Sequence, residues 1–107
     1  FLFEGVLPDL NIGTNNGRTC GIKIEETTLE VCSTANNYNI VLNGRFKGGW
    51  TTRHYGRPSE GIHAIQLEIA QRTYMEENSP WSYREEFANA LRKNLKKLLN
   101  SLEKVVI

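Results

Sequence analysis

The segment from residue 43 to residue 58, NGRFKGGWTTRHYGRP, concentrates side chains that could bind an anion. It has no acidic residue, although the whole chain of 107 residues balances 13 basic against 12 acidic ones. Its cations are Arg45, Lys47, Arg53 and Arg57, and its histidine is His54. Arginine matches carboxylate and phosphate with paired hydrogen bonds, and glycine lets the backbone approach a ligand closely. The residue types predict either an anion-binding loop or a solvated loop without a ligand.

Glu68 is the second residue whose position could serve chemistry. The segment IHAIQLEIA, residues 62–70, alternates as a strand does, which places Gln66 and Glu68 together on the face opposite its most apolar side. A partly desolvated carboxylate in such a place could act as a general acid or base. An edge-strand carboxylate that faces water, or one that pairs with Arg72 or a loop arginine, fits the same pattern.

The cysteines and histidines give only a weak metal signal. Cys20 and Cys32 are the only cysteines, and we expect both to be free and buried in a cytoplasmic protein, because the sequence has no secretion signal. Together with His54 and His63 they are scattered between positions 20 and 63, without the paired spacing of a zinc site. We therefore expect this chain alone to bind no metal.

Around these residues the sequence predicts alternating strands and helices in a single domain, residues 1–107. Residues 1–20 are rich in Asn, Gly and Thr and indicate a loop, whose tightest turn is at 15–17. Residues 21–36 fit either a strand or a helix; we favour the helix, because several apolar residues share one helical face and two glutamates suit its first turn. Residues 38–44 indicate a short buried strand.

The last element is predicted most clearly. After Pro80, Ser82 and Glu85 form a capping-box pattern, which predicts where the helix begins. An apolar stripe at intervals of three and four residues then runs from Phe87 to Val105, with basic residues on the opposite face. We expect an amphipathic helix that packs its apolar face on the core.

The overall composition limits the possible partners. A content of 39% hydrophobic and 23% charged residues is that of a soluble globular protein. No run approaches the roughly 18 apolar residues of a membrane-spanning helix, so we expect no membrane span. A net charge of +1 argues against a nucleic-acid partner, because such proteins usually carry a broad basic excess.

Three motifs resemble the C-terminal half of the N-formylglutamate amidohydrolase family: LPDLNIGTNNGRTC, NGRFKGGWTTRHYGRP and GIHAIQLEIAQRTYM, in this order over residues 7–75. The resemblance implies an α/β fold, part of an α/β/α sandwich on a mixed sheet similar to the zinc carboxypeptidase and aspartoacylase-like hydrolases. It implies hydrolysis of N-formyl-L-glutamate, a small dicarboxylate, to formate and L-glutamate in bacterial histidine degradation. A divalent metal, with zinc the expected ion, would serve the full-length enzyme.

The resemblance also implies roles for individual residues. Glu68 matches the general base. The positions that would hold the substrate carboxylates are Asn43, Arg45, Lys47 and Arg53, with His54 binding a carboxylate or the formyl oxygen. The same pocket would be lined by Asn11, Thr14 and Asn15. Packing for His54, and turn chemistry for the three residues of the first motif, remain open alternatives.

The sequence departs from the family in one large respect. The metal-binding motifs of the family lie upstream of the matching region and are absent from these 107 residues. We therefore expect a C-terminal fragment that is inactive by itself and that associates with itself through unpaired strand edges. A hydrolase of the same superfamily acting on another N-acyl amino acid, and a non-catalytic anion-binding module, are the alternatives.

Overall fold

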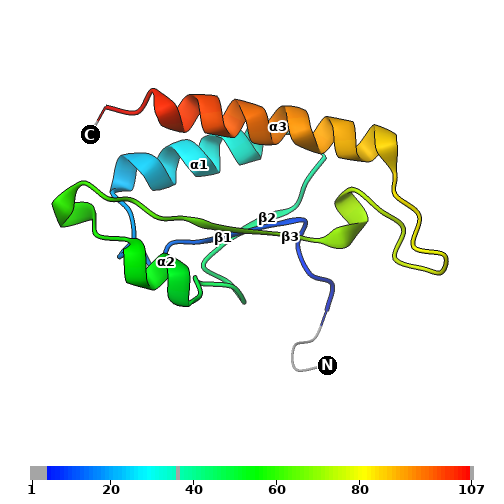
Figure 1. Ribbon diagram of the computed structural model, residues 1–107, viewed down its shortest axis with the longest axis horizontal. Coiled ribbons are helices and arrows are strands. Elements are labelled where there is room, and N and C mark those ends of the chain that lie inside the picture. Colours follow the sequence, from blue (N-terminus) through cyan, green and yellow to red (C-terminus); the bar gives the residue numbers. More distant parts are fainter. Residues whose placement is uncertain (1–4, 36, 107) are drawn as a thin grey trace.

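The computed structural model describes residues 5–35 and 37–106 and shows a small α/β domain (Figure 1). The elements in chain order are β1 (Leu10–Gly13), α1 (Ile22–Thr34), β2 (Ile40–Leu42), α2 (Trp50–Tyr55), β3 (Gln66–Ile69) and α3 (Glu85–Glu103), with short 3-10 helices at Pro58–Glu60 and Gln71–Thr73. In Figure 1, α1 and α3 cover one side of the sheet, and the short α2 lies on the other side.

The three strands form a mixed sheet in the order β2-β1-β3. The central strand β1 runs parallel to β2, with Leu10 beside Ile40, and antiparallel to β3, with Asn11 opposite Glu68. All four residues of β1 are buried. The C-terminal ends of β1 and β2 therefore meet the beginning of β3 at one end of the sheet.

The prediction of a loop over residues 1–20 is wrong at residues 10–13, because these form β1, the central strand of the sheet. Leu10 and Ile12 face the hydrophobic core, but the polar Asn11 between them is also fully buried. Its side-chain Nδ2 donates hydrogen bonds to the carbonyls of Pro8 and Glu68, which removes most of the cost of burying an amide. The turn predicted at 15–17 is confirmed by three positive φ angles, of 48°, 57° and 83°. Residues 1–4 of the predicted loop lie outside the described part.

The helix favoured for residues 21–36 is confirmed as α1, with Asn36 outside the described residues. The strand predicted at 38–44 is confirmed but confined to β2, whose residues are partly buried and not fully buried as expected. The strand predicted at 62–70 is confined to β3, because the preceding residues bond elsewhere: Ile62 exchanges backbone hydrogen bonds with Arg57, and the N–H of Ala64 donates to Thr19.

The loop expected over residues 43–58 is partly wrong, since it contains α2, and its last residue, Pro58, begins a 3-10 helix. Gly49 and Gly56 flank the six residues of α2 and adopt extended backbone angles there. A helix of six residues is too short to show a helical period in the sequence. The glycines that indicated a loop therefore mark the two ends of a helix.

The amphipathic helix α3 is confirmed, but it begins at Glu85 rather than after Ser82, and no side chain caps its first turn. Ser82 instead accepts a hydrogen bond from the N–H of Glu76 through its carbonyl, in the segment that precedes the helix. Val105 of the predicted stripe lies beyond the helix end. The stripe residues that reach the core are Leu91 and Leu98, which are buried, and Leu95 and Leu102, which are partly buried.

The hydrophobic core lies between the sheet and the two long helices. Its buried members are Leu10, Ile12, Val31, Cys32, Leu91 and Leu98. Cys20 and Cys32 are free and buried, as the sequence predicted. Burial raises the pKa of both thiols; that of Cys20 reaches about 11, with a smaller contribution from the negative charge of Glu25. Among the described helices, none is long and apolar enough to cross a membrane.

Candidate functional site

The segment of residues 43–58, called the basic segment below, is fastened directly onto the sheet. A Cβ atom at Gly13 would lie 2.7 Å from the carbonyl carbon of Lys47 and 2.8 Å from the nitrogen of Gly48, so only glycine permits this approach. The backbone N–H of Asn15 donates to the carbonyl of Lys47 at 2.6 Å. The N–H of Gly49 donates to Oε1 of Gln66 at 2.6 Å. The basic segment is thus attached to both β1 and β3.

These contacts place the basic segment and Glu68 on one face of the sheet. Leu10 and Ile12 face the core, so the alternation of β1 puts Gly13 on the opposite face. In β3, the core-facing Leu67 alternates with Gln66 and Glu68 in the same way. The backbone of the basic segment therefore crosses the face from which the carboxylate of Glu68 projects. Its anchor at Gln66 is two residues from Glu68 along β3.

Thr14 and Asn43 join the C-terminal ends of β1 and β2. The N–H of Thr14 donates to Oδ1 of Asn43 at 2.9 Å, and Nδ2 of Asn43 donates back to the Thr14 hydroxyl at 2.9 Å. That hydroxyl donates to Oε1 of Glu25 at 2.7 Å and also accepts the N–H of Gly17 at 3.0 Å. The fully buried hydroxyl thus uses its one donor and both lone pairs. Asn43 itself has a φ of 53°, a left-handed conformation that asparagine tolerates well.

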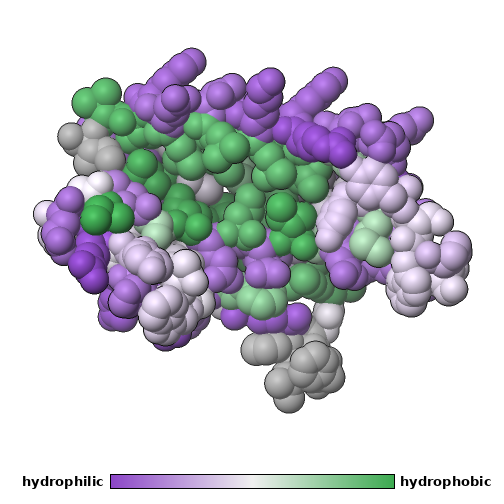
Figure 2. Space-filling model, in the orientation of Figure 1, coloured by the Kyte–Doolittle hydropathy of each residue, from purple (hydrophilic) through white to green (hydrophobic). Residues whose placement is uncertain are grey.

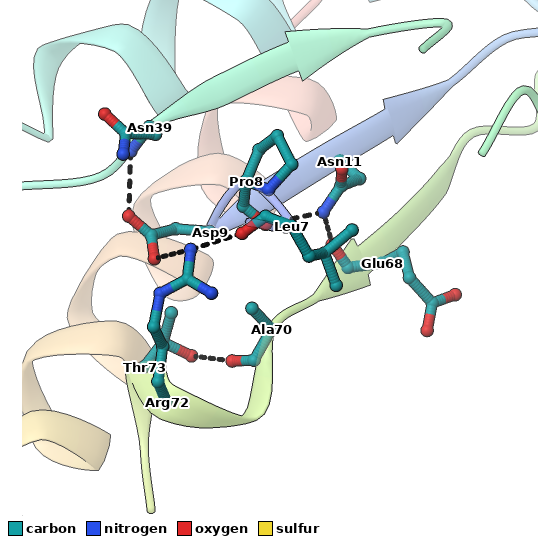
Figure 3. Close-up of polar contacts among 9 residues, drawn as sticks. All are labelled: Leu7, Pro8, Asp9, Asn11, Asn39, Glu68, Ala70, Arg72 and Thr73. Atoms are coloured by element: carbon teal, nitrogen blue, oxygen red, sulfur yellow. Dashed lines mark hydrogen bonds and ion pairs between the residues drawn. The ribbon is translucent and has the colours of Figure 1, made fainter. Parts of the chain in front are cut away.

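Asn11 lies deeper on the same face. Its two bonds to carbonyls connect Pro8, two residues before β1, to the backbone of Glu68 across the sheet (Figure 3). Its Oδ1 is buried, and no described residue donates a hydrogen bond to it. Both N–H groups of the amide are spent inside the protein, so Asn11 acts here as a tie between strands.

The cations of the basic segment are exposed. Lys47, Arg53 and Arg57 form no ion pair with any residue in the described ranges, although Nε of Arg53 donates to the carbonyl of Gly49 at 3.3 Å. Arg45 is exposed as well. The ring of His54 stacks on Trp50 with ring centroids 4.3 Å apart and an angle of 12° between the planes. This end of the sheet therefore presents positive charge to the solvent.

Glu68 is also exposed, and within the described part of the chain its carboxylate forms no ion pair. In the described structure this carboxylate belongs to an edge strand and faces water. A pair with Arg72 is wrong, because Arg72 binds Asp9 at 2.8 Å instead. Figure 3 shows the Glu68 carboxylate pointing away from that ion pair.

Two residues of this end were not selected from the sequence as site residues. Gln66 is the anchor of Gly49, and its position beside Glu68 is visible in the strand alternation. Its hydrogen bond to Gly49 forms only because the chain folds back and places the basic segment against β3, which the sequence pattern does not show. Glu25 accepts the Thr14 hydroxyl from the first turn of α1, and no local pattern connects these two residues.

The described residues do not form a metal centre. Within residues 5–35 and 37–106, no three side chains of histidine, cysteine, aspartate or glutamate come together as metal ligands would. The divalent metal implied by the family resemblance therefore does not fit the donor set at this end of the sheet.

Comparison with known proteins identifies the family. Residues 1–75 match the family model described as N-formylglutamate amidohydrolase. The chain is 54% identical over 101 residues to N-formylglutamate deformylase of Pseudomonas putida and 52% identical to that of Pseudomonas aeruginosa, in each case over 94% of this chain and 38% of the relative. The crystal structure of N-formylglutamate amidohydrolase from Ralstonia eutropha superposes with a TM-score of 0.79 at 28% identity, over 94% of this chain and 35% of that one. The chain thus spans well under half the length of these relatives, and it belongs to the N-formylglutamate amidohydrolase family.

Proposed function

We propose that this chain forms one wall of the active site of a hydrolase that converts N-formyl-L-glutamate to formate and L-glutamate. The observation that carries the proposal is the shared face: Gly13 and Gln66 hold the basic segment on the side of the sheet from which Glu68 projects. The names of the relatives, N-formylglutamate deformylase, supply the substrate. A cationic wall beside a carboxylate suits the hydrolysis of a dianion, because one part binds charge while the other moves a proton.

The cations would bind the two carboxylates of the substrate. Arg45, Lys47 and Arg53 are exposed on the basic segment, and we assign the substrate carboxylates to them. Asn43 donates one N–H to Thr14, which leaves its second N–H for an oxygen of the substrate. His54, stacked on Trp50, would contact a carboxylate or the formyl oxygen.

A positioning role beneath the basic segment would belong to Asn11, Thr14 and Asn15. The polar groups of Asn11 and Thr14 are buried and largely committed to other protein groups, and Asn15 contributes its backbone N–H to Lys47. We therefore favour a positioning role over substrate contact for these three residues. The hydrogen bonds of Thr14 and Asn15 position the backbone of the basic segment, whereas those of Asn11 position the strand that carries Glu68.

Glu68 would act as the general base. Its carboxylate takes a proton from the attacking water as the oxygen bonds to the formyl carbon. It then returns a proton to the nitrogen of glutamate as the C–N bond breaks. The divalent metal expected in this family, with zinc the expected ion, would have its ligands in the part of the family fold that this chain does not match. The sheet would there complete an α/β/α sandwich similar to that of the carboxypeptidase and aspartoacylase-like hydrolases, in a cytoplasmic enzyme.

The test uses a chimera in which this chain replaces the region that it matches in the Pseudomonas putida relative. In this chimera, Glu68→Gln should lower kcat for N-formyl-L-glutamate at least about 100-fold with little change in KM. Glu60→Gln, at an exposed acid of the 3-10 turn, is the matched control and should leave kcat unchanged. A Glu68→Gln chimera that keeps its kcat would remove the general-base assignment.

The chain by itself should show no turnover, and clear hydrolysis by it alone would contradict the division of the site. Substrate choice is tested separately with N-formyl-L-glutamine, which lacks one carboxylate. The chimera should use it with a much lower kcat/KM, because one charged contact is lost. A preference for this or another N-acyl amino acid would correct the substrate while leaving the chemistry in place.

A further inference from the structure

Glu25 is an acidic residue of the helical layer whose side chain bonds at the end of the sheet. Figure 2 shows hydrophilic side chains along the outer surface of α3 and hydrophobic ones between α3 and the level of the sheet, which is the usual division of a helix face. Glu25, in the first turn of α1, is partly buried, and its Oε1 accepts the hydroxyl of the fully buried Thr14 at 2.7 Å. Its neighbour Glu26 is exposed. Glu25 is therefore bonded into the candidate site and is not a solvated helix charge.

The Thr14 hydroxyl has only one direction in which it can donate. The backbone N–H of Gly17, at 3.0 Å, is a donor and can only meet a lone pair of the hydroxyl oxygen. Nδ2 of Asn43, at 2.9 Å, is also a donor, because the oxygen of the same amide accepts the Thr14 N–H. The remaining neighbour is the Glu25 carboxylate, which only accepts when it is ionised. Glu25 therefore receives the hydroxyl proton and leaves both lone pairs for Gly17 and Asn43.

This arrangement fixes the orientation of the Asn43 amide. The backbone N–H of Asn43 donates to the carbonyl of Ile12 at 2.7 Å, and Thr14 holds both polar atoms of the side chain. One N–H of Nδ2 is bonded to the hydroxyl, and the planar amide then sets the direction of the second N–H. Without an acceptor at position 25, the buried hydroxyl proton would lack a partner or would face another donor, and either is costly. The Asn43 amide would then turn to relieve that contact.

We propose that Glu25 is a positioning residue for Asn43 and acts on it through the Thr14 hydroxyl. The inference rests on the proposed function, in which the second N–H of Asn43 binds an oxygen of the substrate. Glu25 itself does not contact the substrate: it accepts the hydroxyl proton and thereby keeps the amide directed as a donor. Its negative charge alone would oppose the binding of a dianion, because like charges repel. Positioning and repulsion therefore predict opposite effects when Glu25 is replaced.

Kinetics of the chimera with the Pseudomonas putida relative separate the two effects. Glu25→Leu removes the acceptor and fills its space with apolar atoms, so KM for N-formyl-L-glutamate should rise about fivefold or more, with kcat changed less than about twofold. Glu25→Gln keeps an oxygen acceptor without the charge and should return KM to within about twofold of the wild type. Glu26→Leu, next to it on α1, is the matched control and should leave KM unchanged. A lower KM in both Glu25 variants would assign the residue to charge repulsion and overturn the proposal.

Thr14→Val distinguishes a failure of this inference from a failure of the proposed function. It removes the hydroxyl that bonds Asn43 and should raise KM at least as much as Glu25→Leu does. Adding Glu25→Leu to it should raise KM no further, because the connection to Asn43 is already broken. A raised KM for Thr14→Val beside an unchanged KM for Glu25→Leu would overturn this inference and leave the proposed function in place. An unchanged KM for both variants would remove the substrate contact assigned to Asn43.

Hydrogen exchange at single amides of the same chimera tests the inference without substrate. The Gly17 amide donates to the Thr14 hydroxyl, and the Thr14 amide donates to Oδ1 of Asn43. In Glu25→Leu both amides should exchange at least about tenfold faster than in the wild type, and Glu25→Gln should keep them protected. The Arg18 amide, which donates to the Thr14 carbonyl at 3.0 Å, is the internal control and should change less. Unchanged exchange of both amides in Glu25→Leu would overturn the inference. If no variant changes KM, faster exchange still supports the role of Glu25 in orienting Asn43.

Discussion

The two ends of the sheet use similar side chains in opposite ways. At the N-terminal end of β1, the carboxylate of Asp9 accepts the N–H of Asn39 at 2.9 Å and pairs with Arg72 at 2.8 Å (Figure 3). Arg72 also donates to the carbonyl of Leu7. At the C-terminal end, Lys47 and Arg53 extend into solvent without an ionic partner among the described residues. At the first end the charged side chains pair with each other, and at the second end the cations remain available to bind a ligand.

This difference separates the residues that hold the fold from those that could hold a ligand. A buried or half-buried ion pair is costly to break, because the remaining charge is left without compensation. An exposed cation contributes little to folding and can be kept for binding. The two ends should therefore respond differently to substitution, and four experiments, from the largest expected effect on stability to the smallest, test that contrast.

The N-terminal end should give the largest effect. Asp9→Ala leaves the Arg72 guanidinium without its partner and the Asn39 N–H without its acceptor, so the free energy of unfolding should fall by about 3 kcal/mol. Denaturant titration of the isolated chain measures this change in the free energy of unfolding. Glu76→Ala, which breaks the exposed pair with Arg84 at 3.4 Å, is the control and should cost at most about 1 kcal/mol. Equal losses for the two variants would contradict the contrast.

The hydrogen-bonded part of the C-terminal end should follow. Thr14→Val removes a buried hydroxyl that bonds Asn43, Glu25 and Gly17, and unfolding free energy should fall by about 2 kcal/mol. Thr14→Ser keeps the hydroxyl and should lose only about 0.8 kcal/mol with the methyl group. If serine costs as much as valine, packing and not the hydroxyl holds this end together.

A smaller, pH-dependent effect should come from the Cys20 thiol. Its pKa is 9.0 when unperturbed and about 11 in the fold, so above pH 9 the unfolded chain releases a proton that the folded chain retains. The stabilisation is complete below pH 9 and is lost as pH rises toward 11. Between pH 8 and pH 10, unfolding free energy should fall by about 1 kcal/mol more in the wild type than in Cys20→Ala. Parallel pH curves for the two proteins would contradict the raised pKa.

The exposed cations should matter least for stability. Lys47→Ala and Arg53→Ala should each change unfolding free energy by less than about 0.5 kcal/mol. In the chimera, each should raise KM for N-formyl-L-glutamate about tenfold or more, because a charge-assisted contact is lost. Lys97→Ala is the control for charge and should leave KM unchanged, because Lys97 is on α3, which covers the opposite side of the sheet from α2 (Figure 1). A large stability loss at position 47 or 53 would mean that these cations belong to the fold after all.

The long helix could be predicted from the sequence, and the central strand could not. α3 is 19 residues long, so Leu91, Leu95 and Leu98 display a helical period that is difficult to mistake. β1 has four residues, of which Asn11 and Gly13 are poor strand formers. Asn11 is stable there because the carbonyl of the distant Glu68, together with that of Pro8, accepts its amide, and Gly13 is needed because the basic segment lies against it. Both reasons are tertiary and leave no local pattern.

The candidate site divides in the same way. Composition alone located the basic segment, and strand alternation placed Glu68 beside Gln66. The bond from Gly49 to Gln66 and the bond from Thr14 to Glu25 join residues 17 and 11 positions apart, so they depend on how the chain folds back. Sequence patterns identify the charged groups, whereas the contacts that fix their positions require the three-dimensional structure.

Gly13 has a consequence for how variants of this family would be interpreted. It bears no functional group, yet the backbone of Lys47 and Gly48 rests where its side chain would be. Even a methyl group at position 13 would push the backbone of Lys47 and Gly48 away from the sheet and would move the cations relative to Glu68. The core on the other face of the sheet would not be changed. A loss of function on substitution of Gly13 would therefore indicate that the basic segment has moved relative to the sheet, in a protein that is still folded.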